Sequence, residues 1–239
     1  MRKNSLLGPA TALCFIFFVH TAGAKDIDSC ASYPDVPVNV KVVFDEPKYD
    51  FTKNLASVQA IANGGGQGIP ENDAITMGIT RYQSVLEFQA PTIVHTAPGQ
   101  PACAYVQHID ATIGYRDVTV FVASEIPQGS CAFDETIGHE QKHIAVNRHI
   151  LDEFVPLIEE RLKDYLRLNG VIQVENADRA EKVLRDKLKS IMAESISQIE
   201  EENLRRQRDV DSEEEYNRLA HVCDGALGKI AGQYHPSVP

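Results

Sequence analysis

Alternating apolar residues predict a small β-sheet in the first half of the chain. Within residues 36–44 most even-numbered positions are apolar, which is the period-two pattern of a half-buried strand. Residues 79–89 have high β propensity and predict a second strand. Residues 105–109 and 113–122 predict two more, which we expect to be antiparallel neighbours, whereas the prolines in residues 90–102 predict a loop. The pattern therefore predicts a small antiparallel sheet of about four strands.

The period changes to that of helices in the second half of the chain. Apolar residues recur at intervals of three, four and seven across residues 144–165, which predicts one long helix capped by Asp134 and ended by the Asn-Gly pair at 169–170. We expect Pro156 to kink or split this helix. A second long helix is predicted over residues 177–207, folding back antiparallel on the first. Strands followed by helices indicate an α+β fold.

The first residues have the composition of a secretion signal. A charged start is followed by an apolar run at residues 12–19 and by Ala-Gly-Ala at 22–24, which is a cleavage sequence. We expect residues 1–24 to be removed and the protein to be periplasmic or secreted, with no stable membrane insertion after cleavage. The remaining chain divides into a β-rich part over 25–133 and a helical part over 134–239, which together make one compact domain.

Charge and cysteine content narrow the class of protein. The formal net charge of -11 at pH 7 argues against nucleic acid as a partner. Cys14 leaves with the signal segment, and the four cysteines that remain suggest two disulfides in an oxidising compartment. We expect Cys103 to pair with Cys131, and Cys30 with Cys223.

A His-Glu-x-x-His (HExxH) motif supplies the candidate chemistry. His139 and His143 are four residues apart and share one face of a helix, so both imidazoles can bind one ion. Histidine nitrogen suits Zn²⁺, and a catalytic zinc keeps one position for water. Glu140 lies beside that position, where it can take a proton from the water. Because a strand at 118–122 precedes the motif, the arrangement is typical of zinc peptidases.

Two histidines do not complete a ligand set, and one interpretation adds His149. His139, His143 and His149 have the spacing of metzincin ligands. However, metzincins break the helix with a glycine where this chain has Val146. In an unbroken helix, His149 is rotated by about 80° from His139 and about 120° from His143.

A second interpretation takes a carboxylate from the returning helix. Glu202 continues the apolar stripe of that helix, and a turn centred near residue 172 places residue 201 opposite His143. Two histidines and a glutamate are a known ligand set of catalytic zinc.

A third interpretation uses the acidic segment that follows the second helix. Tyr216 or His221 can also stabilise the oxyanion of a tetrahedral intermediate. The residues of this segment that can reach the metal are Asp209, Asp211, Glu214 and Tyr216. The third ligand stays open among these interpretations.

Several features follow one another in a recognisable order. They are Tyr49, Gly78-Ile79-Thr80, Cys103, the strands to Val122, and the motif from His139 to His143. This order, over about residues 36–220, resembles a family of uncharacterised exported bacterial proteins described as secreted zinc-dependent protease-like. The resemblance implies a zincin-like fold, Zn²⁺ as cofactor and peptidase activity. In that family a closing histidine is a candidate third ligand, but here Tyr216 stands at its position.

Together these observations predict an exported zinc-dependent metallopeptidase, a hydrolase that uses a zinc-activated water. Glu140 is the expected base, and Tyr216 has an oxyanion or ligand role. We expect the strand at 118–122 to pair along its edge with an extended peptide or protein substrate of the cell envelope. The alternative is a non-catalytic periplasmic binding protein on the same scaffold, which contacts a partner through its acidic helices.

Overall fold

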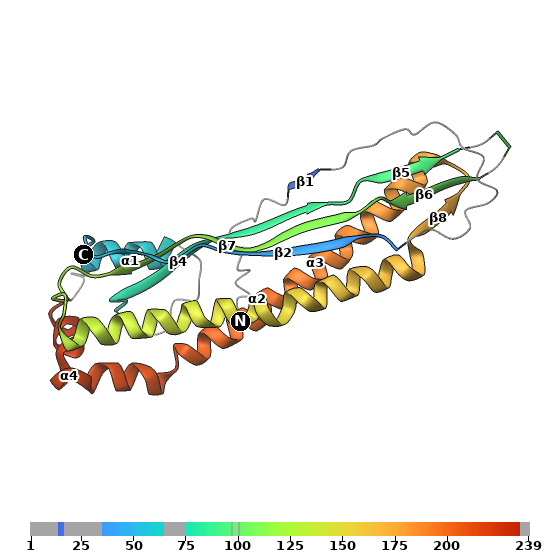
Figure 1. The fold of residues 1–239 in the computed structure, drawn as a ribbon. Coiled ribbons are helices and arrows are strands. Elements are labelled where there is room, and N and C mark those ends of the chain that lie inside the picture. The colour runs from blue at the N-terminus through green and yellow to red at the C-terminus, as the bar shows by residue number, and fades with distance from the viewer. Residues whose placement is uncertain (1–13, 17–34, 65–74, 97, 100, 235–239) are drawn as a thin grey trace, which may run out of the picture.

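A computed structural model describes residues 14–16, 35–64, 75–96, 98–99 and 101–234. Two sheets and a pair of long helices form an elongated α+β structure, as the order of apolar patterns predicts (Figure 1). Most of the predicted signal segment, and Cys30, lie outside the described residues.

The larger sheet is mixed rather than antiparallel. β4 is antiparallel to β7, but β2 and β3 both pair with β7 in parallel. The strand order is β1-β4-β7-β2, with β3 beside the other end of β7. The chain reverses twice between β3 and β7, so these strands run in the same direction. The strands are β1 (Cys14–Ile16), β2 (Val38–Phe44), β3 (Lys48–Asp50), β4 (Gly78–Gln89) and β7 (Ile109–Val122).

A smaller sheet continues the long hairpin of the larger one. β5 (Thr92–His95) follows β4, and β6 (Ala102–Val106) precedes β7, so the two arms of one hairpin run through both sheets. The prediction that residues 105–109 and 113–122 are antiparallel neighbours is therefore wrong, because they are consecutive segments of one arm. β8 (Val171–Val174) completes the small sheet by pairing with β6.

β7 lies inside the sheet, so it is not the edge strand that the sequence predicts to bind an extended substrate. Residues 119–121 pair with β4 on one side and with β3 on the other. The predicted strand at 118–122 thus has no free edge for a peptide. In the described residues, the outer edge of β4 has a partner only at residues 87–89, where β1 lies against it. The edge of residues 78–86 is open within that part of the chain.

The helices are longer than their sequence patterns predict. α2 (Cys131–Asn169) begins after Ser130, whose hydroxyl accepts a hydrogen bond from the backbone N–H of Phe133, so Asp134 is not its cap. The helix runs through Pro156 without a break, and Val155 and Ile158 on either side of it are buried in the core. The other helices are α1 (Leu55–Gly64), α3 (Ala177–Val210) and α4 (Glu213–Gln233).

The core lies between the helix pair and the two sheets. α2 packs on the strands of the larger sheet, and α3 packs on α2 and on the smaller sheet. The largest fully buried side chains of the two helices are Ile150, Leu151, Leu162, Leu184, Leu188 and Met192. None of the helices in the described residues is long and apolar enough to cross a membrane.

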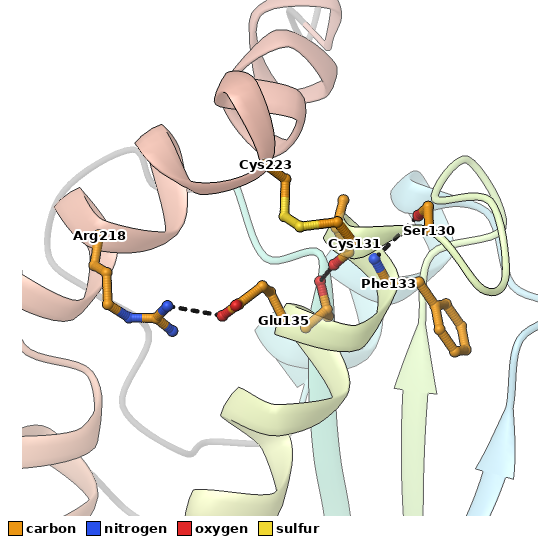
Figure 2. Close-up of a disulfide and its surroundings, with 8 residues drawn as sticks. Ser130, Cys131, Phe133, Glu135, Arg218 and Cys223 are labelled. Carbon is orange, nitrogen blue, oxygen red and sulfur yellow. Dashed lines mark hydrogen bonds and ion pairs between the residues drawn. A yellow bond between two sulfur atoms is a disulfide. The ribbon is translucent and has the colours of Figure 1, made fainter.

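A disulfide joins the start of α2 to α4 (Figure 2). Cys131 is bonded to Cys223, so the predicted pairs Cys103–Cys131 and Cys30–Cys223 are wrong. α4 folds back beside the first turn of α2 and brings the two Cα atoms to 5.7 Å. Cys103, on β6, is disulfide-bonded as well.

Candidate metal centre

The two motif histidines lie together on α2. Their Nε2 atoms are 3.2 Å apart, as the spacing of four residues predicts. His139 is buried and His143 is partly buried, because α3 and α4 cover this face of the helix.

Asp211 brings a third donor atom from the junction of α3 and α4. Its Oδ1 lies 3.3 Å from Nε2 of His139 and 3.2 Å from Nε2 of His143. Asp211 is the C-cap residue of α3, and its backbone N–H donates to the carbonyl of Gln207 at 3.0 Å. The helix end therefore fixes where this carboxylate lies.

The distances between the three donor atoms fit one small cation. A tetrahedron with metal–ligand bonds of about 2.0 Å has edges of about 3.3 Å. The three observed separations are 3.2, 3.2 and 3.3 Å. Three lone-pair donors at this separation repel one another unless a positive charge lies between them. His139, His143 and Asp211 can thus hold a metal ion.

The outer nitrogens of the histidines face polar partners. Nδ1 of His143 lies 2.5 Å from Oε1 of Gln207, and Nδ1 of His139 lies 3.5 Å from Oε1 of Glu215. Such partners orient the rings so that the Nε2 lone pairs face the metal. Glu215 is itself held by Lys142 and Arg218, and Arg218 extends the network to Glu135 near the disulfide (Figure 2).

Protons compete with a metal ion for the donor atoms of His143 and Asp211. Burial acts to lower the pKa of His143, but hydrogen bonding to Asp211 and the charges of Glu140 and Asp211 outweigh it and raise this pKa to about 9. Burial acts to raise the pKa of Asp211, but the hydrogen bonds to His139 and His143 outweigh it and hold this pKa well below its usual value. In the metal-free protein, a proton therefore supplies the positive charge that the cluster requires.

Glu140 is buried between α2 and β4. Only 3% of this residue is exposed, and its Oε2 accepts a hydrogen bond of 2.7 Å from the hydroxyl of Thr80. Burial raises the pKa of Glu140, while the charges of His143 and His139 and the Thr80 bond oppose the shift. A Cβ on Gly78 would lie 2.9 Å from Oε1 of Glu140, so the glycine allows β4 to approach this closely.

Tyr216 lies at the cluster without replacing a ligand. Its hydroxyl donates to Oδ1 of Asp211 at 3.0 Å, and its ring centre is 6.1 Å from that of His139. Burial and the neighbouring charge of Asp211 raise the pKa of Tyr216. The side chain is therefore a neutral hydroxyl donor at neutral pH.

Other candidate ligands lie outside the cluster. His149 is exposed, and Glu202 is bonded to Arg205 and Arg206. Of the acidic segment, Asp209 pairs with Arg205 and Glu214 is exposed. His221 is also exposed, with its Nδ1 against the carbonyl of Asn217.

The fold-back of α3 is offset from its expected position. Gln207, rather than residue 201, lies opposite His143. Gln207 and Glu215 were not among the predicted site residues. Ser212-x-x-Glu215 has the spacing of a capping box and is a signal for the start of α4.

No protein-family model, curated protein or solved structure matches this chain.

Proposed function

We propose that the protein is an exported zinc-dependent metallopeptidase. The observation that carries this proposal is the convergence of Nε2 of His139, Nε2 of His143 and Oδ1 of Asp211 beside the buried Glu140. Two imidazoles and one carboxylate are a donor set that Zn²⁺ uses in catalytic sites, with one position left for water. Zinc held there would lower the pKa of that water to about 7 and polarise a carbonyl.

In this proposal Asp211 is the third ligand and Glu140 is the general base. Thr80 holds one oxygen of the Glu140 carboxylate, which leaves Oε1 to accept the proton of the attacking water. Tyr216 is a neutral donor beside the cluster; in this proposal its hydroxyl proton, donated to Asp211 in the free protein, turns to the oxygen that gains negative charge at the scissile carbonyl.

The substrate is an extended peptide segment that pairs with β4. Residues 78–86 have an open edge in the described part of the chain, and the same strand carries Thr80 and Gly78 next to the base. Backbone hydrogen bonds along a strand edge would place a peptide bond beside the metal with little dependence on sequence.

Export is supported by the disulfides and by the signal-like start of the chain. Cys131–Cys223 and the bonded Cys103 are typical of proteins from an oxidising compartment. We therefore propose that the enzyme acts on peptides or proteins of the cell envelope.

The first test is zinc content. The oxidised protein should hold about one zinc per chain, and His139→Ala should lose it. His149→Ala is the matched control, because this exposed histidine lies on the same helix away from the cluster. A wild-type protein that stays at background after zinc is added back would contradict the metal site.

The second test is hydrolysis of a mixed peptide library, followed by mass spectrometry. Glu140→Gln should keep zinc and lose cleavage, whereas Glu160→Gln at an exposed position of α2 should keep both. Cleavage that survives Glu140→Gln would rule out the proposed mechanism. Zinc binding with no cleavage by the wild-type protein would favour the alternative of a non-catalytic binding protein.

A further inference from the structure

Gln207 contacts two of the three candidate metal ligands, one through its side chain and the other through its backbone. Its Oε1 lies 2.5 Å from Nδ1 of His143. Its carbonyl accepts the backbone N–H of Asp211 at 3.0 Å. One residue of α3 therefore touches both His143 on α2 and Asp211 at the start of the junction with α4.

The orientation of the Gln207 amide is determined by its neighbours. Its Nε2 faces three oxygen acceptors: the carbonyl of His143 at 3.3 Å, Oδ1 of Asn147 at 2.9 Å and Oδ1 of Asn203 at 3.1 Å. A flipped amide would place its oxygen against these three oxygens and would lose the hydrogen bonds that the two N–H groups of the amide donate to them. The amide oxygen must therefore face His143.

Asn203 and Asn147 hold the Gln207 amide in this orientation by accepting hydrogen bonds from its nitrogen. Asn147 is only 1% exposed, so its amide has to be satisfied inside the protein. Asn203 accepts from Gln207 and donates through Nδ2 to the hydroxyl of Tyr115 at 3.3 Å and that of Tyr82 at 3.5 Å. Donation thus runs in one direction, from Gln207 to Asn203 and from Asn203 to the tyrosine hydroxyls of the sheet.

An acceptor at Nδ1 determines which nitrogen of a neutral histidine carries the proton. With the Gln207 oxygen at 2.5 Å, Nδ1 of His143 is the N–H and Nε2 has the free lone pair. That lone pair faces Asp211 and His139, where the proposed metal binds.

We propose that Gln207 is a positioning residue, which holds His143 in the Nδ1–H tautomer. Its side chain touches neither the metal position nor a substrate, and its effect is transmitted through His143. This inference rests on the proposed zinc site for its affinity measurement, but not for the state of the His143 ring.

The test compares three variants of the full-length oxidised protein. Gln207→Met keeps the size and removes the acceptor, while Gln207→Glu keeps an acceptor for His143. Gln198→Met is the matched control, because Gln198 is an exposed residue of α3 that is bonded to Arg161. Zinc affinity is measured by competition with a chelator. The His143 ring is observed by ¹⁵N NMR of the metal-free protein over a pH titration, and the tautomer is assigned at the high-pH end, where the ring is neutral.

We expect Gln207→Met to weaken zinc binding by about 10- to 100-fold and to lose the pure Nδ1–H signature of His143. Gln207→Glu should keep that signature, and Gln198→Met should match the wild type. A His143 ring that stays Nδ1–H in Gln207→Met would overturn the inference, as would unchanged zinc affinity. If the wild-type protein binds no zinc, the proposed function fails, while the NMR signature still decides the role of Gln207.

Discussion

The hydroxyl of Thr80 donates a hydrogen bond of 2.7 Å to Oε2 of Glu140 and joins strand β4 to helix α2. Both residues are buried, so no bulk water replaces this donor. Burial raises the pKa of Glu140, and the Thr80 bond is one of the interactions that oppose the rise. The strand thus influences the ionisation of the proposed base.

Thr80→Val should therefore shift the pH dependence of peptide hydrolysis. The substitution keeps the shape of the side chain and removes the donor, so the pKa of Glu140 rises further. Because the base acts as a carboxylate, the acid limb of the kcat/KM profile should move to higher pH. The free energy of unfolding at neutral pH should fall by about 1–3 kcal/mol. Thr80→Ser keeps the hydroxyl and should keep the acid limb, and an unshifted limb in Thr80→Val would contradict this role.

Zinc affinity should rise steeply with pH. The pKa of His143 is raised to about 9 in the metal-free protein, so zinc must displace a proton at neutral pH. We expect the apparent association constant to increase about tenfold per pH unit below 9 and to level off above it. Calorimetry in buffers of different ionisation enthalpy counts the released protons, and zinc binding without proton release at pH 7.5 would disprove the coupling.

The same proton should stabilise the metal-free protein. The pKa of His143 in the folded state is above its ordinary value, so its contribution is fully present below the ordinary pKa. It is lost as the pH rises through about 9. Chemical denaturation of the metal-free protein should show a smaller free energy of unfolding at pH 10 than at pH 6. His143→Gln is the comparison variant, and it should show a smaller decrease over this range.

Tyr216→Phe should affect turnover more than metal binding. The hydroxyl donates to Asp211 but is not one of the three converging donor atoms, so zinc affinity should fall less than tenfold. Loss of a donor to the developing oxyanion should lower kcat by about 10²- to 10³-fold. Tyr165→Phe, on α2 away from the cluster, is the control. A loss of zinc with kcat unchanged per bound metal would mean that Tyr216 only orients Asp211.

Removal of the Cys131–Cys223 disulfide should weaken both stability and zinc binding. This bond fastens α4 to the start of α2, and α4 carries Glu215 and Tyr216 beside the cluster. In the Cys131→Ser/Cys223→Ser protein we expect a loss of about 2–4 kcal/mol in the free energy of unfolding, together with a weaker zinc Kd. Cys103→Ser breaks a disulfide on β6, at the far end of the molecule from α4 (Figure 1), and should change stability alone.

Local patterns predict the parts of the site that lie on one helix. His139, Glu140 and His143 are arranged by helical spacing alone, and their relative positions follow directly from the motif. Asp211 was one of several acidic candidates, because its place depends on how far α3 extends past the cluster. β8 lies between the two helices, and a four-residue strand is too short to give a reliable pattern.

The pairing of strands in the sheet also cannot be predicted from local sequence patterns. The strands at 38–44 and 78–89 have clear local patterns, but strand neighbours are chosen by contacts that are distant in sequence. β7 has partners on both sides because the chain ahead of α1 returns to it in parallel. Disulfide pairing fails for the same reason, since α4 had to be recognised before Cys223 could be placed beside Cys131.

The disulfide and the group of His139, His143 and Asp211 close two loops of the chain, one inside the other. Cys131 and Cys223 bound the outer loop, and His143 and Asp211 bound the inner one. Closing the outer loop first shortens the distance that the ligands must search in the unfolded chain, so it lowers the entropy cost of closing the inner loop. Oxidative folding would thus prepare the chain to capture metal, and assembly would favour oxidation before metal uptake.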